Sequence, residues 1–111
     1  MKMKWSEYKP FPDPRKLEYL HAPFGAGIYE LLNTKTKELI KVGEGANVAE
    51  RMSSLLPKPY GASGRNNQPL RDYILQNLKS IAYRTLPCID KGEAMSIEKQ
   101  LRKTQIYMFP R

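Results

Sequence analysis

The chain has 111 residues and a mass of 12.8 kDa, which predicts a single domain with one hydrophobic core. Its composition of 41% hydrophobic and 27% charged residues excludes a collagen-like repeat and a long disordered chain. The single cysteine excludes an internal disulfide, and no Cys/His cluster could form a zinc site. No apolar run reaches the roughly 18 residues of a membrane span, so we expect a cytoplasmic protein that is neither secreted nor membrane-bound.

The charge balance is strongly basic and unevenly distributed. Lys and Arg number 19 and Asp and Glu number 11, which gives a formal net charge of +8. Residues 51–88 carry six basic side chains and a single acidic one, Asp72, and so hold +5 of the excess. Such a local excess indicates a polyanionic partner, most often nucleic acid, and the alternative is a basic protein with no such role.

Residues 1–24 are predicted to be an N-terminal extension, and residues 25–111 are predicted to form the domain itself. Prolines at positions 10, 12, 14 and 23 forbid a long helix in the extension. Its aromatic side chains are expected to pack on the domain. These aromatic residues are Trp5, Tyr8 and Phe11.

A β-hairpin is predicted to begin the domain, because the apolar runs 27–32 and 38–42 flank a polar turn at 33–37. A helix is expected to start at Asn47 and to end before Pro57. The hairpin and the helix are therefore the first three elements of the expected fold.

The second half of the chain is predicted to contain helix, strand and helix. A helix starts at Pro69, a strand covers residues 80–87, and Asp90 caps a last helix whose buried face includes Met108. The order strand, strand, helix, helix, strand, helix predicts an α/β domain of the α+β type. Its sheet would have three strands, antiparallel or mixed, flanked by helices.

The segment between the first two predicted helices, residues 57–68, is rich in Gly, Pro, Ser and Asn and is expected to be an exposed loop. Its polar side chains suit phosphate groups and base edges, which makes it a candidate nucleic-acid contact. The alternative is a helix-to-helix connection kept soluble by polar residues. The candidate contacts in and beside the loop are Lys58, Arg65, Asn66, Asn67 and Arg71.

Two charged residues fall on apolar helix faces. The helical spacing turns Arg51 toward Val48 and Leu55, and it turns Glu98 toward the apolar side of the last helix. A charge removed from water is costly unless it is paired. One interpretation is that Arg51 and Glu98 pair with each other or lie at the edge of their faces. The other is one site with a guanidinium for phosphate and a carboxylate for a cation.

The triplet Gly27-Ile28-Tyr29, the triplet Lys41-Val42-Gly43, a helical Arg51 and a late helical Glu98 form an ordered set that resembles the GIY-YIG nuclease family. The first triplet is identical to the family signature. The resemblance covers residues 24–108 and implies a small sheet flanked by helices. It also implies an endonuclease that cuts DNA with one divalent metal ion, Mg²⁺ or Mn²⁺. The sequence itself leaves RNA open as an alternative substrate, and it leaves open whether the protein is a monomer or a homodimer.

By this resemblance Tyr29 would be the general base, Arg51 would hold the scissile phosphate and Glu98 would ligate the metal. Lys41 stands where the family has its second tyrosine, and we hypothesise that it favours the phenolate of Tyr29 or contacts phosphate. The alternative is that Lys41 points to solvent. The asparagine that the family often has after its last helix has no counterpart after Asn77. The competing hypothesis is therefore a catalytically impaired, nuclease-like module that binds nucleic acid.

Overall fold

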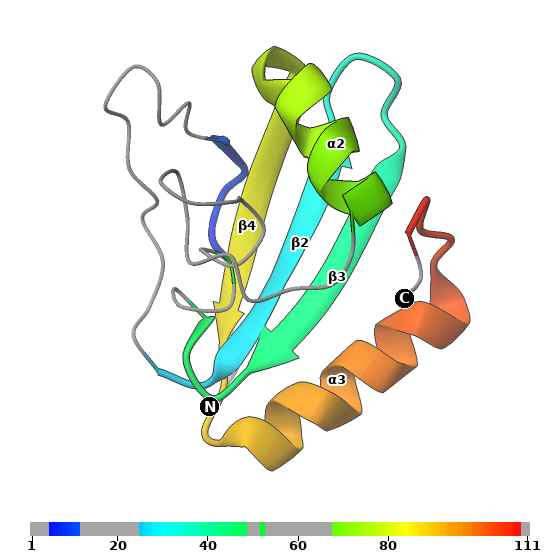
Figure 1. The fold of residues 1–111 in the computed structure, drawn as a ribbon. Coiled ribbons are helices and arrows are strands. Elements are labelled where there is room, and N and C mark those ends of the chain that lie inside the picture. Colours follow the sequence, from blue (N-terminus) through cyan, green and yellow to red (C-terminus); the bar gives the residue numbers. More distant parts are fainter. Residues whose placement is uncertain (1–4, 12–24, 49–51, 53–67, 110–111) are drawn as a thin grey trace.

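Four antiparallel strands form one sheet in the order β1-β4-β2-β3 (Figure 1). The strands are β1 at Lys9–Pro10, β2 at Gly27–Asn33, β3 at Leu39–Gly45 and β4 at Ile81–Pro87. The computed structural model describes residues 5–11, 25–48, 52 and 68–109. Within these ranges the chain is a small α+β domain in which β2 lies between β3 and β4.

The three strands predicted from the sequence are all present. β2 and β3 pair as the expected hairpin, with Tyr29 opposite Gly43 and a shift of register between Leu31 and Leu32. On its other side β2 pairs with β4, where Thr85 lies opposite Tyr29. The central strand is thus hydrogen-bonded on both sides, which satisfies its backbone groups away from water.

The prediction of a three-stranded sheet is wrong, because part of the expected N-terminal extension forms a fourth strand. Lys9 lies opposite Tyr83, and Pro10 lies opposite Ala82. The next residue, Phe11, is 3% exposed and meets the Tyr83 ring edge-on with the ring centroids 6.1 Å apart. A strand of two residues has no measurable periodicity, and its proline is tolerated because the strand lies at the sheet edge.

Different helices cover the two faces of the sheet (Figure 1). Helix α2, Gln68–Gln76, packs in a core cluster that includes Tyr29 and Leu31 of β2. Helix α3, Lys91–Thr104, packs in a second cluster that includes Ile28. Because successive strand residues point to opposite faces, β2 contributes to both cores. Neither of these two described α-helices is long and apolar enough to cross a membrane.

The first predicted helix, from Asn47 to the residue before Pro57, lies mostly outside the described residues. Val48 and Met52 are described, and both are helical and fully buried. They belong to the same core cluster as α2. This placement agrees with the apolar face that their spacing of four residues predicts.

Helix α3 begins where the sequence predicts and ends earlier. The Asp90 carboxylate accepts a hydrogen bond from the Glu93 backbone N–H at 2.8 Å, which is the expected N-cap. The helix ends at Thr104, so Met108 lies beyond it and is 39% exposed, contrary to the prediction that it belongs to the buried helix face. Tyr107 is buried instead, because the chain after the helix runs beside β3 and bonds to the backbone of that strand.

Candidate functional site

The ring of Tyr29 lies across the edge strand β3 at Gly43, its partner in the antiparallel register. A Cβ atom added at Gly43 would overlap the ring carbons and the hydroxyl oxygen of Tyr29. Only glycine leaves room for the ring at this position. The two triplets singled out in the sequence therefore lie on neighbouring strands and meet at the pair of Tyr29 and Gly43, where the tyrosine of the first needs the glycine of the second.

Lys41 shares the sheet face of Tyr29. It lies opposite Leu31 and two residues before Gly43, and alternation along a strand puts all of these on one side. Lys41 is only 5% exposed, so the alternative in which its side chain points to solvent is wrong. Lys41 is therefore buried on the sheet face that also holds Tyr29.

Tyr29 itself is fully buried. Its exposed fraction is 0%, and it belongs to the cluster that also holds Val48, Met52 and Ile74. In this conformation the phenol has no contact with solvent. A reaction at its hydroxyl would require the covering side chains to move, since a phosphodiester could not otherwise reach it.

Glu98 lies on α3 with a half-buried side chain that is 14% exposed. Its carboxylate forms an ion pair with Arg102 one helical turn later, at 3.3 Å. The apolar residues of α3 pack with Ile28, on the face opposite Tyr29. The ring of Tyr29 and helix α3 thus lie on opposite faces of the sheet. Both reach β3, because the ring lies over Gly43 and α3 packs along the strand.

Among the described residues, no group of three or more His, Cys, Asp and Glu side chains gathers around a point that could hold a metal ion. Within the described ranges, a divalent ion at Glu98 would therefore have at most two protein ligands of these types. This donor set fits Mg²⁺, which commonly keeps several waters and takes further ligands from substrate phosphate. The rest of such a site would come from water and nucleic acid.

Most of the predicted nucleic-acid contacts fall outside the described residues. These are Lys58, Arg65, Asn66 and Asn67, and Arg51, the predicted phosphate ligand, is outside as well. Arg71 is described and lies half-buried on α2. The proposed pairing of Arg51 with Glu98 therefore stays a prediction.

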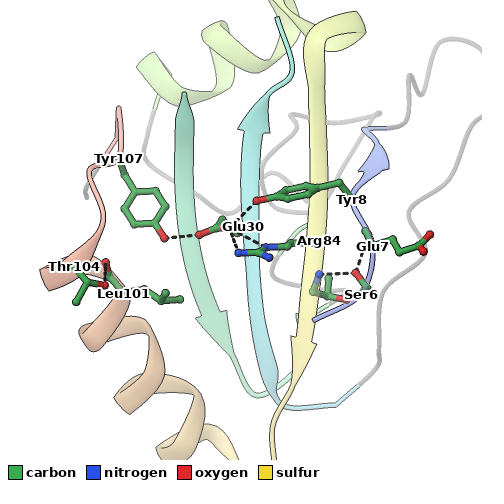
Figure 2. Close-up of polar contacts among 9 residues, drawn as sticks. Ser6, Glu7, Tyr8, Glu30, Arg84, Leu101, Thr104 and Tyr107 are labelled. Carbon is green, nitrogen blue, oxygen red and sulfur yellow. Dashed lines mark hydrogen bonds and ion pairs between the residues drawn. The ribbon is translucent and has the colours of Figure 1, made fainter. Parts of the chain in front are cut away.

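A buried carboxylate that the sequence did not single out lies at the centre of the other sheet face (Figure 2). Glu30 on β2 is 1% exposed. One carboxylate oxygen accepts hydrogen bonds from the Tyr8 hydroxyl at 2.8 Å and from Nε of Arg84 at 2.9 Å, and it pairs with a terminal guanidinium nitrogen of Arg84 at 2.7 Å. The other oxygen accepts from the Tyr107 hydroxyl at 2.5 Å.

The groups around Glu30 hold one another in place. The Arg84 guanidinium lies 4.1 Å from the centre of the Trp5 ring and 4.9 Å from that of Tyr8. Burial, and after it the hydrogen bond to Glu30, raises the pKa of Tyr8 and of Tyr107 well above the ordinary value for tyrosine. Both phenols therefore stay neutral donors, and the cluster fastens segments from both ends of the chain to the central strand.

A signal for this cluster was present in the sequence. Glu30 is a lone acidic residue inside an apolar strand segment, and such a charge has to find partners when the strand is buried on both faces. Its partners could not be named, because they lie 22, 54 and 77 positions away in the chain.

Comparison of the chain with family models, with curated proteins and with solved structures found no match.

Proposed function

We propose that this protein is a metal-dependent endonuclease that hydrolyses phosphodiester bonds of DNA. The observation that carries the proposal is the packing of the Tyr29 ring across Gly43, with the buried Lys41 on the same sheet face. This neighbourhood joins the two triplets on which the resemblance to the GIY-YIG nucleases depends. The proposal assigns the general base to Tyr29, the phosphate ligand to Arg51 and the metal ligand to Glu98.

The chemistry requires few groups. Hydrolysis of a phosphodiester needs a positioned water and stabilisation of the negative charge that develops on the phosphate oxygens. Tyr29 would take the proton of the attacking water, and Arg51 would hold the phosphate. Lys41 would favour the phenolate through its positive charge. A metal ion held by Glu98 would supply Lewis-acid stabilisation of the same phosphate.

The proposal is tested by following the conversion of supercoiled plasmid to nicked circles with and without Mg²⁺. We expect Mg²⁺-dependent nicking that falls about 100-fold or more in Glu98→Gln and in Tyr29→Phe. Glu7→Gln is the matched control, because Glu7 is an exposed carboxylate in the N-terminal segment. Nicking that survives Glu98→Gln would point to a contaminating nuclease and would contradict the proposal.

A second candidate function is favoured by the complete burial of Tyr29 and by the ion pair of Glu98 with Arg102. In this alternative the domain binds nucleic acid without cutting it. It predicts DNA binding that weakens steeply with salt and no nicking with either Mg²⁺ or Mn²⁺. The same plasmid assay, combined with a binding titration, separates the two functions.

A further inference from the structure

The turn between β2 and β3 is held rigidly by one buried side chain. Asn33 is 5% exposed, and its side-chain oxygen accepts hydrogen bonds from the backbone N–H groups of Lys35 at 2.9 Å and Thr36 at 3.1 Å. Its backbone pairs with Lys37 at 2.7 Å and with Glu38 at 2.9 Å. Such an Asx turn leaves the backbone of the turn little freedom.

The same turn is fastened to its neighbours. The Asn33 side-chain nitrogen donates to the Tyr73 hydroxyl of α2 at 2.8 Å. The backbone N–H of Thr34 donates to the carbonyl of Ser80 at 2.7 Å. Ser80 ends the short 3₁₀-helix η2, Leu78–Ser80, so the turn and η2 meet at one end of the sheet.

Three exposed lysines gather at this end and are called here the basic end. They are Lys35 and Lys37 in the turn and Lys79 in η2. The turn also carries one exposed acid, Glu38, whose backbone N–H is bound by the Thr36 hydroxyl at 3.3 Å. The basic end therefore keeps an excess of positive charge on a rigid support.

Lys37 has a backbone conformation that does not suit a lysine. Its φ is 66°, and no other non-glycine residue among those described has a positive φ. A side chain with a Cβ is strained there, whereas glycine adopts this conformation without steric cost and asparagine tolerates it. Glycine at this position would relieve the steric strain. A strained residue that is held in place by its surroundings points to a use of its side chain.

We propose that Lys35, Lys37 and Lys79 bind backbone phosphates of the nucleic acid on which the protein acts. This inference rests on the proposed function and deepens it by adding a second contact region. Lysine ammonium groups contact phosphates without reading base sequence. A rigid turn loses little conformational entropy on binding, because its backbone is already fixed by Asn33.

The basic end contacts the substrate away from the scissile bond. Tyr29 and Asn33 are four residues apart on β2, which corresponds to about 13 Å along the strand. Phosphates on one strand of a duplex are spaced about 3.4 Å apart along its axis. For a duplex whose axis follows β2, the lysines therefore reach phosphates about four nucleotide steps or more from the one at Tyr29. A duplex that ends before this point loses the contact.

The test measures binding of a fluorescent duplex by anisotropy in EDTA, so that cleavage does not interfere. The decisive variant is Lys37→Gly, for which we expect several-fold weaker binding, a salt slope reduced by about one and a higher melting temperature. Because this variant is expected to be more stable, its weaker binding cannot come from unfolding. Lys35→Ala and Lys79→Ala should also bind several-fold more weakly. The control Lys99→Ala removes an exposed lysine of α3 and should bind like the wild type.

The outcomes separate this inference from the proposed function. Wild-type affinity in Lys37→Gly and Lys35→Ala would overturn the basic end as a contact and would leave the nuclease proposal in place. Lysine-dependent binding without nicking in Mg²⁺ would overturn the nuclease proposal and support the contact. Lysine-dependent binding to phosphatidylserine vesicles with no binding to the duplex would overturn the inference, since the partner would then be a membrane surface.

Discussion

The ring of Tyr29 on β2 occupies the space above Gly43 on β3, and a single added carbon at Gly43 would overlap it. This relationship ties the two triplets of the candidate site together through packing. It also makes the glycine of the second triplet a requirement of the fold, whatever chemistry the tyrosine performs.

Gly43→Ala should therefore destabilise the protein by about 3 kcal/mol, because it forces the buried Tyr29 ring from its place. Urea denaturation followed by circular dichroism measures the change in the free energy of unfolding. Gly25→Ala is the matched control, since no atom lies within 4 Å of a Cβ at that position. Equal stability of the two variants would show that the ring does not lie over Gly43.

Glu30→Gln should destabilise the protein by about 2 to 3 kcal/mol. The amide keeps the shape of the side chain but removes the charge that Arg84 pairs with, and its NH₂ group cannot accept from a tyrosine hydroxyl. Glu38→Gln changes an exposed carboxylate on the adjoining turn and should stay within about 0.5 kcal/mol of the wild type. A similar small effect in Glu30→Gln would contradict the buried cluster.

Stability should fall with rising pH above about 10, the ordinary pKa of tyrosine. The fold raises the pKa of Tyr107, so the folded state keeps a proton that the unfolded state releases. The stability that Tyr107 contributes is complete below the pKa that this tyrosine has in the unfolded chain. It is lost as the pH rises toward the pKa that the tyrosine has in the folded protein. Unfolding free energies measured from about pH 8 to about 11 should thus decline more steeply for the wild type than for Tyr107→Phe. Parallel curves would show that burial and the hydrogen bond to Glu30 do not raise the pKa of Tyr107 in the folded protein.

Lys41→Met replaces a buried ammonium with an apolar chain of similar length. If the protein is a nuclease, the pH–rate profile of plasmid nicking should shift to higher pH, since a cation near Tyr29 favours its anion. An unchanged profile would show that Lys41 does not activate Tyr29. A rate lowered equally at all pH values would instead indicate a contact of Lys41 with phosphate.

Local patterns allowed the main elements to be predicted. The hairpin of β2 and β3 and the strand β4 follow from apolar runs and a polar turn, and the start of α3 follows from the cap formed by Asp90 and Glu93. These signals depend on interactions within a few residues. Local signals did not predict β1, because a strand of two residues has no periodicity. They also placed Met108 in the last helix, because the apolar spacing continues past Thr104, where α3 ends.

By itself the sequence determined the hairpin of β2 and β3, the strand β4 and the start of α3. It also determined which residues stand out chemically, such as Tyr29, Lys41 and Glu98. Only the tertiary structure decided that Gly43 makes room for the Tyr29 ring and that Lys41 is buried. It alone brought Tyr8, Arg84 and Tyr107 to Glu30. The physical reason is that hydrogen bonds and packing within a turn or a helix are set by neighbours in the chain. Strand register and buried charge pairs depend instead on residues that meet only when distant segments come together.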